Sequence, residues 1–318
     1  MSINQTYWRH YFDEATIVRS NALRQEMTLQ STGVNIHMDV YEQADKSAPV
    51  LIVNHGGGGY SRIFLPVMLA LYERGYTLIA PNQRGQGYSE GSRGDFTVGQ
   101  FVQNIVDVTH WGRLRYSGAL FLLGGSVGSS LVYNAAAEGV PVDAIICHNL
   151  YDFGSVHDTI ALSRFAALRH IPGFPALMSA TIRLFAALMP GLRLPFRALG
   201  KFEAMVDERD TRFYDIWKND PLPIQSVSLR YLRSTFTTPA RIPFEANTCP
   251  ILVINPMRDT MVSPAVTNRN YERLGGSKQY VEIDYGHWAT GATFVEEYVQ
   301  IVDQYLQHQL GKPKSSTK

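Results

Sequence analysis

Residues 124–128, Gly-Gly-Ser-Val-Gly, fit the pattern G-x-S-x-G. The apolar segment ALFLLGG leads into the motif and the helix-like segment SSLVYNAAAEG follows it, so a tight turn between a buried strand and a helix is expected. Such a turn exposes the serine hydroxyl and needs glycine at 124 and 128, because side chains there would crowd the turn. Ser126 is therefore the candidate nucleophile, and the Val127 amide at the helix start is a candidate donor to the reacting oxygen.

A serine hydroxyl becomes a good nucleophile only when a base removes its proton. His287 follows the last apolar strand-like segment, in the sequence DYGHW, where the carboxyl end of a parallel strand places functional residues. His55 and His148 also follow strand-like segments and are the rival candidates. His55 precedes a glycine run and is expected to brace that loop. His287 is favoured because, after a serine on a strand-turn-helix motif, the acid and then the histidine follow in the chain, and His287 is the last of the three candidate histidines.

The base needs an acid that fixes its tautomer and stabilises the imidazolium ion. Asp259 lies just beyond the segment ILVINP, between the serine and the histidine in the chain. Asp152, just after the fourth buried strand, is the alternative acid. Asp284 and Glu282 lie on the histidine strand itself and cannot easily turn back to the imidazole. Asp259 is the predicted acid.

Acyl transfer also needs hydrogen-bond donors aimed at the developing oxyanion. The run His55-Gly56-Gly57-Gly58-Gly59 follows the first buried strand, where glycine lets the backbone approach a substrate. The predicted donors are the amides of Gly57 and Val127, with Gly58 as a possible third. The run lacks the G-K-[ST] of a phosphate-binding loop and the G-x-G-x-x-G spacing of a dinucleotide fingerprint. We expect no organic cofactor and no metal.

Buried strands alternate with helical segments before residue 150 and again after residue 246. The strand-like segments are 34–40, PVLIVN, YTLIA, ALFLLGG, DAIICH, ILVINP (251–256) and QYVEID (279–284), and helices are expected at 63–74, around 101–111, at 263–274 and at the end of the chain. This alternation predicts an α/β fold with a mostly parallel sheet and helices on both faces. The alternating strand Val34–Val40 is expected to be antiparallel and to lie at an edge.

The predicted organisation is a core of residues 1–150 and 246–310, a helical cap of residues 151–245 inserted after the sixth strand, and a flexible tail at 311–318. The stretch from Phe174 to Leu192 is apolar but contains Arg183 and prolines, so it fits a lid or core helix better than a membrane span.

Cys147 and Cys249 are expected to be free thiols, since parallel strands would hold them apart.

The chain resembles proteins of the α/β-hydrolase fold, closest to the lysophospholipase, monoglyceride-lipase and serine-aminopeptidase branch. The resemblance rests on the order of four segments: His55-Gly56-Gly57, Asn82 to Ser89, Gly124 to Gly128, and Pro256 to Asp259 with Gly286-His287. It implies the nucleophile, base, acid and oxyanion roles given above. Two positions depart from the family. Asn82 stands where Asp usually opens the D-x-R-G-x-G-x-S segment, and Gly125 stands where a larger residue often precedes the serine.

The chain of 318 residues carries 29 Lys and Arg against 28 Asp and Glu. A nucleic-acid partner would call for a basic excess, and the overall balance offers none. The N-terminal sequence lacks the basic start and apolar run of a signal peptide, so a cytoplasmic location is expected. The expected partner is a small-molecule ester or acyl substrate, and the sequence does not address the oligomeric state.

The leading hypothesis is a carboxylic ester hydrolase that forms an acyl-enzyme on Ser126. An aminopeptidase would use the same triad but needs acids to hold the substrate amine, and the cap offers Glu203, Asp207, Glu208 and Asp210. A thioesterase, an acyltransferase and a carbon–carbon bond hydrolase use the same residues. A non-catalytic ligand receptor on the same fold is the hypothesis from a different class.

Overall fold

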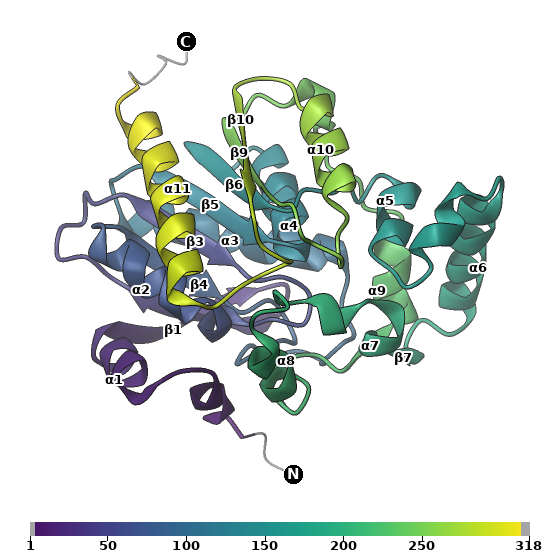
Figure 1. Ribbon diagram of the computed structural model, residues 1–318, viewed down its shortest axis with the longest axis horizontal. Helices are drawn as coiled ribbons and strands as arrows, with labels where there is room; N and C mark the ends of the chain where they lie inside the picture. Colours follow the sequence, from purple (N-terminus) through teal and green to yellow (C-terminus); the bar gives the residue numbers. More distant parts are fainter. Residues whose placement is uncertain (1–3, 313–318) are drawn as a thin grey trace.

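The computed structural model describes residues 4–312. In this part of the chain eight strands form one sheet, in the order β1-β2-β4-β3-β5-β6-β9-β10 (Figure 1). The strands are β1 (Arg24–Ser31), β2 (Val34–Tyr41), β3 (Val50–Asn54), β4 (Thr77–Pro81), β5 (Leu120–Gly125), β6 (Ala144–His148), β9 (Ile251–Pro256) and β10 (Lys278–Ile283). The β1–β2 and β2–β4 pairs are antiparallel, and all other pairs are parallel. The predicted mostly parallel sheet is confirmed.

Helices cover both faces of the sheet, as the alternation predicted. Figure 1 shows α2 (Leu65–Glu73) and α11 (Ala292–Leu310) in front of the sheet, with α3 (Val98–Arg115) and α4 (Val127–Ala137) behind it. Helix α10 (Pro264–Arg273) connects β9 to β10. Because helices bury both faces, the central strands β3, β5, β6 and β9 are buried along their whole length and consist mainly of Val, Ile and Leu.

A long insert separates β6 from β9 and lies beside the carboxyl ends of the strands. It contains α5 (Val156–Ala161), η3 (Ala166–His170), α6 (Phe174–Leu188), β7 (Arg193–Pro195), α7 (Phe196–Leu199), η4 (Phe202–Ala204), α8 (Thr211–Trp217), β8 (Ser226–Ser228), α9 (Leu229–Ser234) and η5 (Phe244–Ala246). We call residues 165–192 the outer arm and residues 196–222 the inner part. The inner part packs over the loops that follow β3 and β10, whereas α6 of the outer arm stands at the far edge of the molecule (Figure 1).

Three details differ from the sequence-based expectations. The strand predicted at 34–40 is not at the edge of the sheet, because β1 pairs outside it. Strand β1 was not predicted, because Met27 and Leu29 are its only large apolar side chains. The insert is not purely helical, since β7 and β8 form a two-stranded antiparallel pair. The chain also begins with elements that were not predicted, η1 (Tyr7–Tyr11) and α1 (Glu14–Leu23).

The apolar stretch from Phe174 to Leu192 forms α6 and the turn after it. Among residues 4–312, every helix is too short or too polar to cross a bilayer.

Both cysteines are free, as expected: Cys147 is buried in β6 and Cys249 is partly buried just before β9. Of the tail predicted at 311–318, only the first two residues belong to the described part of the chain, and the rest lie outside it.

Candidate active site

Ser126 occupies the tight turn between β5 and α4. Its backbone has φ 54° and ψ −123°, a conformation that is strained for any residue with a side chain. Two backbone hydrogen bonds hold the turn: the Ser126 amide donates to the His148 carbonyl at 2.8 Å, and the Ser129 amide donates to the Ser126 carbonyl at 2.9 Å. A strained turn that lifts one hydroxyl out of the sheet is the geometry expected of a nucleophile.

The glycines on either side of Ser126 allow this turn to form. A Cβ at Gly124 would lie 2.1 Å from the carbonyl oxygen of Gly128, and a Cβ at Gly128 would lie 2.6 Å from the carbonyl oxygen of Asn54. Both distances are far below any real carbon–oxygen contact, so strand, turn and helix could not approach one another with larger residues. Gly125 is different, because a Cβ there would meet only Phe64, at 4.0 Å. Its missing side chain leaves space beside the serine.

His287 lies in the loop after β10 and is paired with Asp259, which follows β9. The ring Nδ1 and the Asp259 Oδ2 are 2.8 Å apart, and both side chains are buried. The carboxylate oxygen can only accept, so Nδ1 carries the proton and Nε2 is left with a free lone pair. An imidazole held in this tautomer by a buried carboxylate is equipped to take a proton from a hydroxyl.

Three further donors fix the Asp259 carboxylate. The amides of Met261 and Val262 donate to its Oδ1 at 2.8 and 2.9 Å, and the side-chain amide of Asn149 donates to its Oδ2 at 2.8 Å. Asn149 follows β6 with φ 61°, a left-handed conformation that asparagine tolerates better than most residues. Asn149 was not among the residues predicted from the sequence. The available signal was an asparagine directly after a buried strand that ends at the same edge of the sheet.

Ser126 and His287 line the same cavity, together with His148, Trp288 and the glycine loop. Among the described residues no hydrogen bond joins their side chains, so the serine and the imidazole face a common space without touching. Catalytic hydrogen bonds are often long before substrate binds and shorten in the complex. The structure therefore brings Ser126, His287 and Asp259 to one rim of the sheet from three distant loops.

The two rival histidines have other partners. His55 donates from Nδ1 to the Gly56 carbonyl at 2.9 Å and accepts the Gln83 amide on Nε2 at 3.0 Å, so both ring nitrogens brace the loop. His148 donates from Nε2 to the His287 carbonyl at 2.7 Å, and its buried Nδ1 has no partner among the described residues. Burial lowers the pKa of each ring to about 4, which keeps both neutral.

The rival acids are placed elsewhere. Asp152, the alternative acid, pairs with Arg273 at 3.0 Å and accepts the Gly154 amide at 2.7 Å. Asp284 and Glu282 are exposed at the end of β10. Among these carboxylates and Asp259, only Asp259 contacts the His287 ring.

The glycine loop after β3 lies against the serine turn. A Cβ on Gly57 would meet the Val127 side chain at 3.0 Å, so the backbones of these two predicted donors come close together. Within the described chain neither amide has a recorded hydrogen-bond partner, and Gly57 and Val127 line a cavity with Ser126. Gly58 is buried against Trp217 and lines neither cavity beside Ser126, so its position does not suit a third donor.

Two apolar cavities meet at Ser126. The first is lined mainly by Phe64, Phe202, Met205, Val206, Phe213 and Trp288. The second, of about 120 Å³, extends on the Val127 side and is lined mainly by Phe153, Leu162, Phe196, Leu199, Leu232 and Tyr231. Gly57, Ser126, Phe202 and Met261 border both. No Asp, Glu, Lys or Arg of the described chain lines either cavity.

The inner part of the insert holds the loops of this site. Trp217 is fully buried, stacks on Phe202 and donates from Nε1 to the Gly58 carbonyl at 2.7 Å. Asp207 forms hydrogen bonds with both residues that flank His287. Its carboxylate accepts from the Gly286 amide at 2.6 Å, and its own amide donates to the Trp288 carbonyl at 2.7 Å. Neither the Trp217 contact nor the Asp207 contacts were predicted from the sequence.

The four insert acids considered for binding a substrate amine all have partners. Glu203 pairs with Arg164, Glu208 with Arg258, and Asp210 accepts from Thr290. Asp207 pairs with Arg209 at 2.6 Å, and this hydrogen bond holds the pKa of its carboxyl well below the usual range. These carboxylates are therefore committed to structural contacts outside the two cavities.

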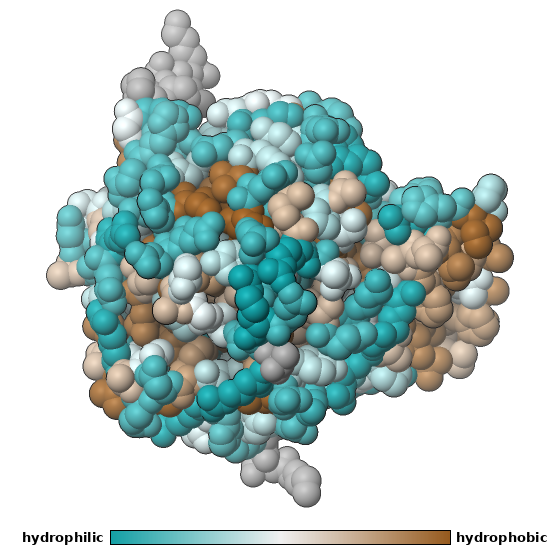
Figure 2. All heavy atoms as spheres, viewed as in Figure 1, coloured by the Kyte–Doolittle hydropathy of each residue, from teal (hydrophilic) through white to brown (hydrophobic). Residues whose placement is uncertain are grey.

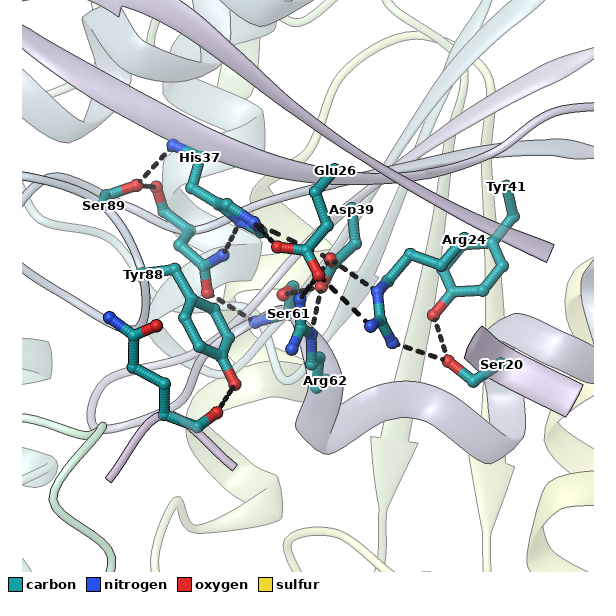
Figure 3. A network of polar contacts seen from close by, with 12 residues as sticks. Ser20, Arg24, Glu26, His37, Asp39, Tyr41, Ser61, Arg62, Tyr88 and Ser89 are labelled. Atoms are coloured by element: carbon teal, nitrogen blue, oxygen red, sulfur yellow. Dashed lines mark hydrogen bonds and ion pairs between the residues drawn. The ribbon is translucent and has the colours of Figure 1, made fainter. Parts of the chain in front are cut away.

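A polar network lies away from Ser126, under the β1–β2 hairpin (Figure 3). Glu26, His37 and Asp39 bring potential metal-ligand atoms within 4.8 Å of one another, the one such group found among the described residues. Two arginines already neutralise them: Arg62 contacts Asp39 at 2.9 Å and Glu26 at 2.8 Å, and Arg24 contacts Asp39 at 3.4 Å. The arrangement is that of an ion-pair network.

Asn82, the departure from the family pattern, belongs to the same network. Its side-chain amide donates to His37 Nδ1 at 2.9 Å, and its Oδ1 accepts the Ser61 amide at 3.0 Å. With Nδ1 as acceptor, His37 donates from Nε2 to Glu26 at 3.0 Å. Burial alone would raise the pKa of Glu26, but the His37 hydrogen bond and the Arg62 charge lower it to about 2. Asn82 thus has a structural contact and does not touch Ser126.

These features define a protein of the α/β-hydrolase fold. Residues 45–288 match the family model described as serine aminopeptidase, S33, and the chain belongs to this family of hydrolases. A curated relative from Escherichia coli, an uncharacterized 31.7 kDa protein in the traX-finO intergenic region, is 30% identical over 112 residues. That match covers 34% of this chain and 39% of the relative.

Solved structures share the fold at low sequence identity. A monoglyceride lipase from Saccharomyces cerevisiae in complex with a substrate analog has a TM-score of 0.70 and 15% identity, covering 90% of this chain and 95% of that one. A monoacylglycerol lipase from Paleococcus ferrophilus has a TM-score of 0.65 and 19% identity, with coverages of 90% and 99%. Est1E from Butyrivibrio proteoclasticus with bound ferulic acid has a TM-score of 0.61 and 19% identity, with coverages of 90% and 100%.

Proposed function

We propose that this protein is a serine hydrolase that cleaves carboxylic esters with an apolar group on each side of the scissile bond. The observation that carries the proposal is the position of Ser126: it stands on a strained turn, faces the His287–Asp259 pair and lies where two apolar cavities meet.

In the proposed reaction the Ser126 Oγ attacks the ester carbonyl while His287 Nε2 takes its proton. The negative charge that develops on the carbonyl oxygen is stabilised by the amides of Gly57 and Val127. The intermediate then collapses, the C–O bond to the alcohol breaks, and the imidazolium returns the proton to the leaving alkoxide. Water, deprotonated by the same imidazole, releases the carboxylic acid from Ser126. Asp259 stays ionised and holds the ring throughout.

The lining of the two cavities argues for an ester over a peptide. A serine aminopeptidase must bind a protonated substrate amine, which calls for a carboxylate inside the site. Glu203, Asp207, Glu208 and Asp210 are engaged outside both cavities. An apolar acyl group in one cavity and an apolar alcohol in the other would leave no charge buried without a partner. Thioester hydrolysis and acyl transfer use the same residues and are separated from ester hydrolysis only by assay.

The test is a substrate panel. Purified protein is assayed with p-nitrophenyl esters from acetate to laurate and with a matched set of aminoacyl p-nitroanilides. We expect hydrolysis of the esters with a maximum of kcat/KM at a medium chain length, no measurable cleavage of the anilides, and no ester cleavage by Ser126→Ala. Cleavage of the anilides in preference to the esters would contradict the proposed esterase function and support an aminopeptidase instead. Binding of the esters without turnover by the wild type would support the receptor hypothesis.

We further propose that residues 151–245 act as a cap on the core formed by residues 1–150 and 246–310. Phe202, Met205 and Phe213 support this proposal, because these insert residues face Ser126 across the first cavity. A cytoplasmic location and a reaction without cofactor or metal remain predictions of the sequence analysis.

A further inference from the structure

Helix α6 exposes an apolar face to solvent. It stands at the edge of the molecule in Figure 1, and the same edge is brown in Figure 2. The exposed large apolar side chains on and around it are Phe165, Ile171, Leu177, Leu184, Phe185, Leu188, Met189 and Leu192. Leu177 and Leu188 are 66% and 69% exposed. A surface helix normally turns its polar face outward, and α6 does not.

The inward face of α6 buries only part of the helix's apolar side chains. Ser179 and Ala186 are buried and Phe174, Met178 and Ile182 are half-buried, whereas the leucines of the helix are exposed. Leu177, Leu184 and Leu188 are spaced at intervals of seven and four, which places them on one side of the helix. A contiguous apolar surface of this kind on a protein marks an interaction site.

The charge around this face has one sign. From residue 159 to residue 202 the chain contains no Asp or Glu but six Lys and Arg. Removing these six from the 29 of the whole chain leaves 23 Lys and Arg against 28 Asp and Glu, so the rest of the protein is net negative. Arg164 pairs with Glu203. Arg169, Arg183, Arg193, Arg197 and Lys201 have no recorded ion pair within the described chain.

We propose that the outer arm docks on a lipid bilayer that contains anionic phospholipid. Its exposed leucines and phenylalanines would enter the interface, while the surrounding cations meet the phosphate groups of the lipids. A second copy of the chain fits the same face poorly, because self-association would bring two sets of unpaired cations together. Each basic residue near an anionic membrane surface strengthens binding about fivefold, an effect that salt screens.

The same face adjoins the site. Helix α6 packs on α9, and the α9 residues Tyr231 and Leu232 line the second cavity beside Ser126. Ser163, which borders this cavity, directly precedes the surface cation Arg164. Leu199, which also borders it, lies two residues after the surface cation Arg197. Docking through the outer arm would thus bring the second cavity next to the lipid. This last step rests on the proposed esterase function, whereas the docking itself does not.

Vesicle flotation tests the docking without the chemistry. Ser126→Ala protein is mixed with vesicles of phosphatidylcholine alone or of phosphatidylcholine with about one third phosphatidylglycerol. We expect binding to the anionic vesicles at least tenfold tighter than to the neutral ones, and a loss of most of that difference in 0.5 M salt. Equal binding to both kinds of vesicle, or binding to neither, overturns the proposal. Because Ser126→Ala is used, failure of the esterase proposal does not affect this result.

Two variants locate the docking surface. Leu177→Ser/Leu188→Ser removes exposed apolar contacts, and Arg183→Gln removes a cation from the same helix. Each should weaken binding to anionic vesicles at least fivefold while leaving p-nitrophenyl butyrate hydrolysis and the circular dichroism spectrum unchanged. The matched control is Leu114→Ser on α3, where the side chain is 85% exposed and should not affect binding. A dimer in light scattering that the double variant dissociates, with no vesicle binding, would assign the face to a second copy instead.

Discussion

The inner part and the outer arm of the insert are attached to the protein in opposite ways. The inner part is tied to the loops that carry the site, through Trp217 to Gly58 and through Asp207 to Gly286 and Trp288. In the outer arm, among the described residues, the side-chain hydrogen bonds stay within the arm and its immediate neighbour Ser163, and backbone bonds join its end to Leu229 and Arg230 of α9 rather than to the loops of the site. The difference indicates that one half of the insert organises the site and the other half presents a surface.

The largest expected effect comes from Asp207. In Asp207→Ala the Gly286 amide loses its acceptor and the loop that carries His287 loses an anchor, so we expect kcat for p-nitrophenyl butyrate to fall about a hundredfold with KM changed less than threefold. Asp207→Asn keeps an acceptor and should recover most of the loss. Asp215→Ala on α8 is the control, because the Asp215 side chain is two-thirds exposed and, among residues 4–312, pairs with Lys218 alone. A parallel fall in that control would show that the insert is merely unstable.

Acid should destabilise the loops under the inner part. Burial holds the pKa of His55 and His148 at about 4, below the 6.5 expected in the unfolded chain. Between these values the unfolded state binds more protons, so the stability that the neutral rings provide is complete above pH 6.5 and is lost as the pH falls toward 4. The expected loss is roughly 2 kcal/mol per ring at pH 5. Urea unfolding of the wild type and of His55→Asn from pH 7.5 to 5 measures it, and equal slopes for the two proteins would contradict the prediction.

Trp217→Phe should have a smaller effect. The ring stack on Phe202 survives, but the buried Gly58 carbonyl loses its donor, which costs about 1–3 kcal/mol of unfolding free energy. We expect kcat to fall about tenfold because the neighbouring Gly57 amide becomes less well fixed. The comparison variant is Phe185→Leu in the outer arm, which should leave kcat within twofold of the wild type. If both variants behave alike, the two halves of the insert do not differ in the way proposed.

The smallest effect is expected from Leu184→Ser in the outer arm. This side chain is more than half exposed in the free protein, so its replacement should change the unfolding free energy by less than about 0.5 kcal/mol. Thermal unfolding without lipid measures this directly. A loss of about 2 kcal/mol or more would mean that the exposed face is covered by protein in solution.

The core of the molecule could be predicted from the sequence because its signals are local. The run ILVINP becomes β9 at the expected residues, and the pattern at 124–128 becomes the turn at Ser126. Contacts between distant segments left no such signal. Asp207 was considered only as an amine-binding acid, and nothing in the residues around it indicates that it lies beside Gly286. The strand β1 was missed because its pairing with β2, and not its own hydrophobic pattern, determines its structure.

The central claim is that Ser126 is the nucleophile, activated by His287, and covalent labelling tests it most directly. The protein is treated with a fluorophosphonate, digested and mapped by mass spectrometry. The account predicts one adduct, on the peptide containing Ser126, formed much more slowly in His287→Ala and absent in Ser126→Ala. An adduct on another residue that persists in Ser126→Ala, or ester hydrolysis by that variant at the wild-type rate, would contradict it.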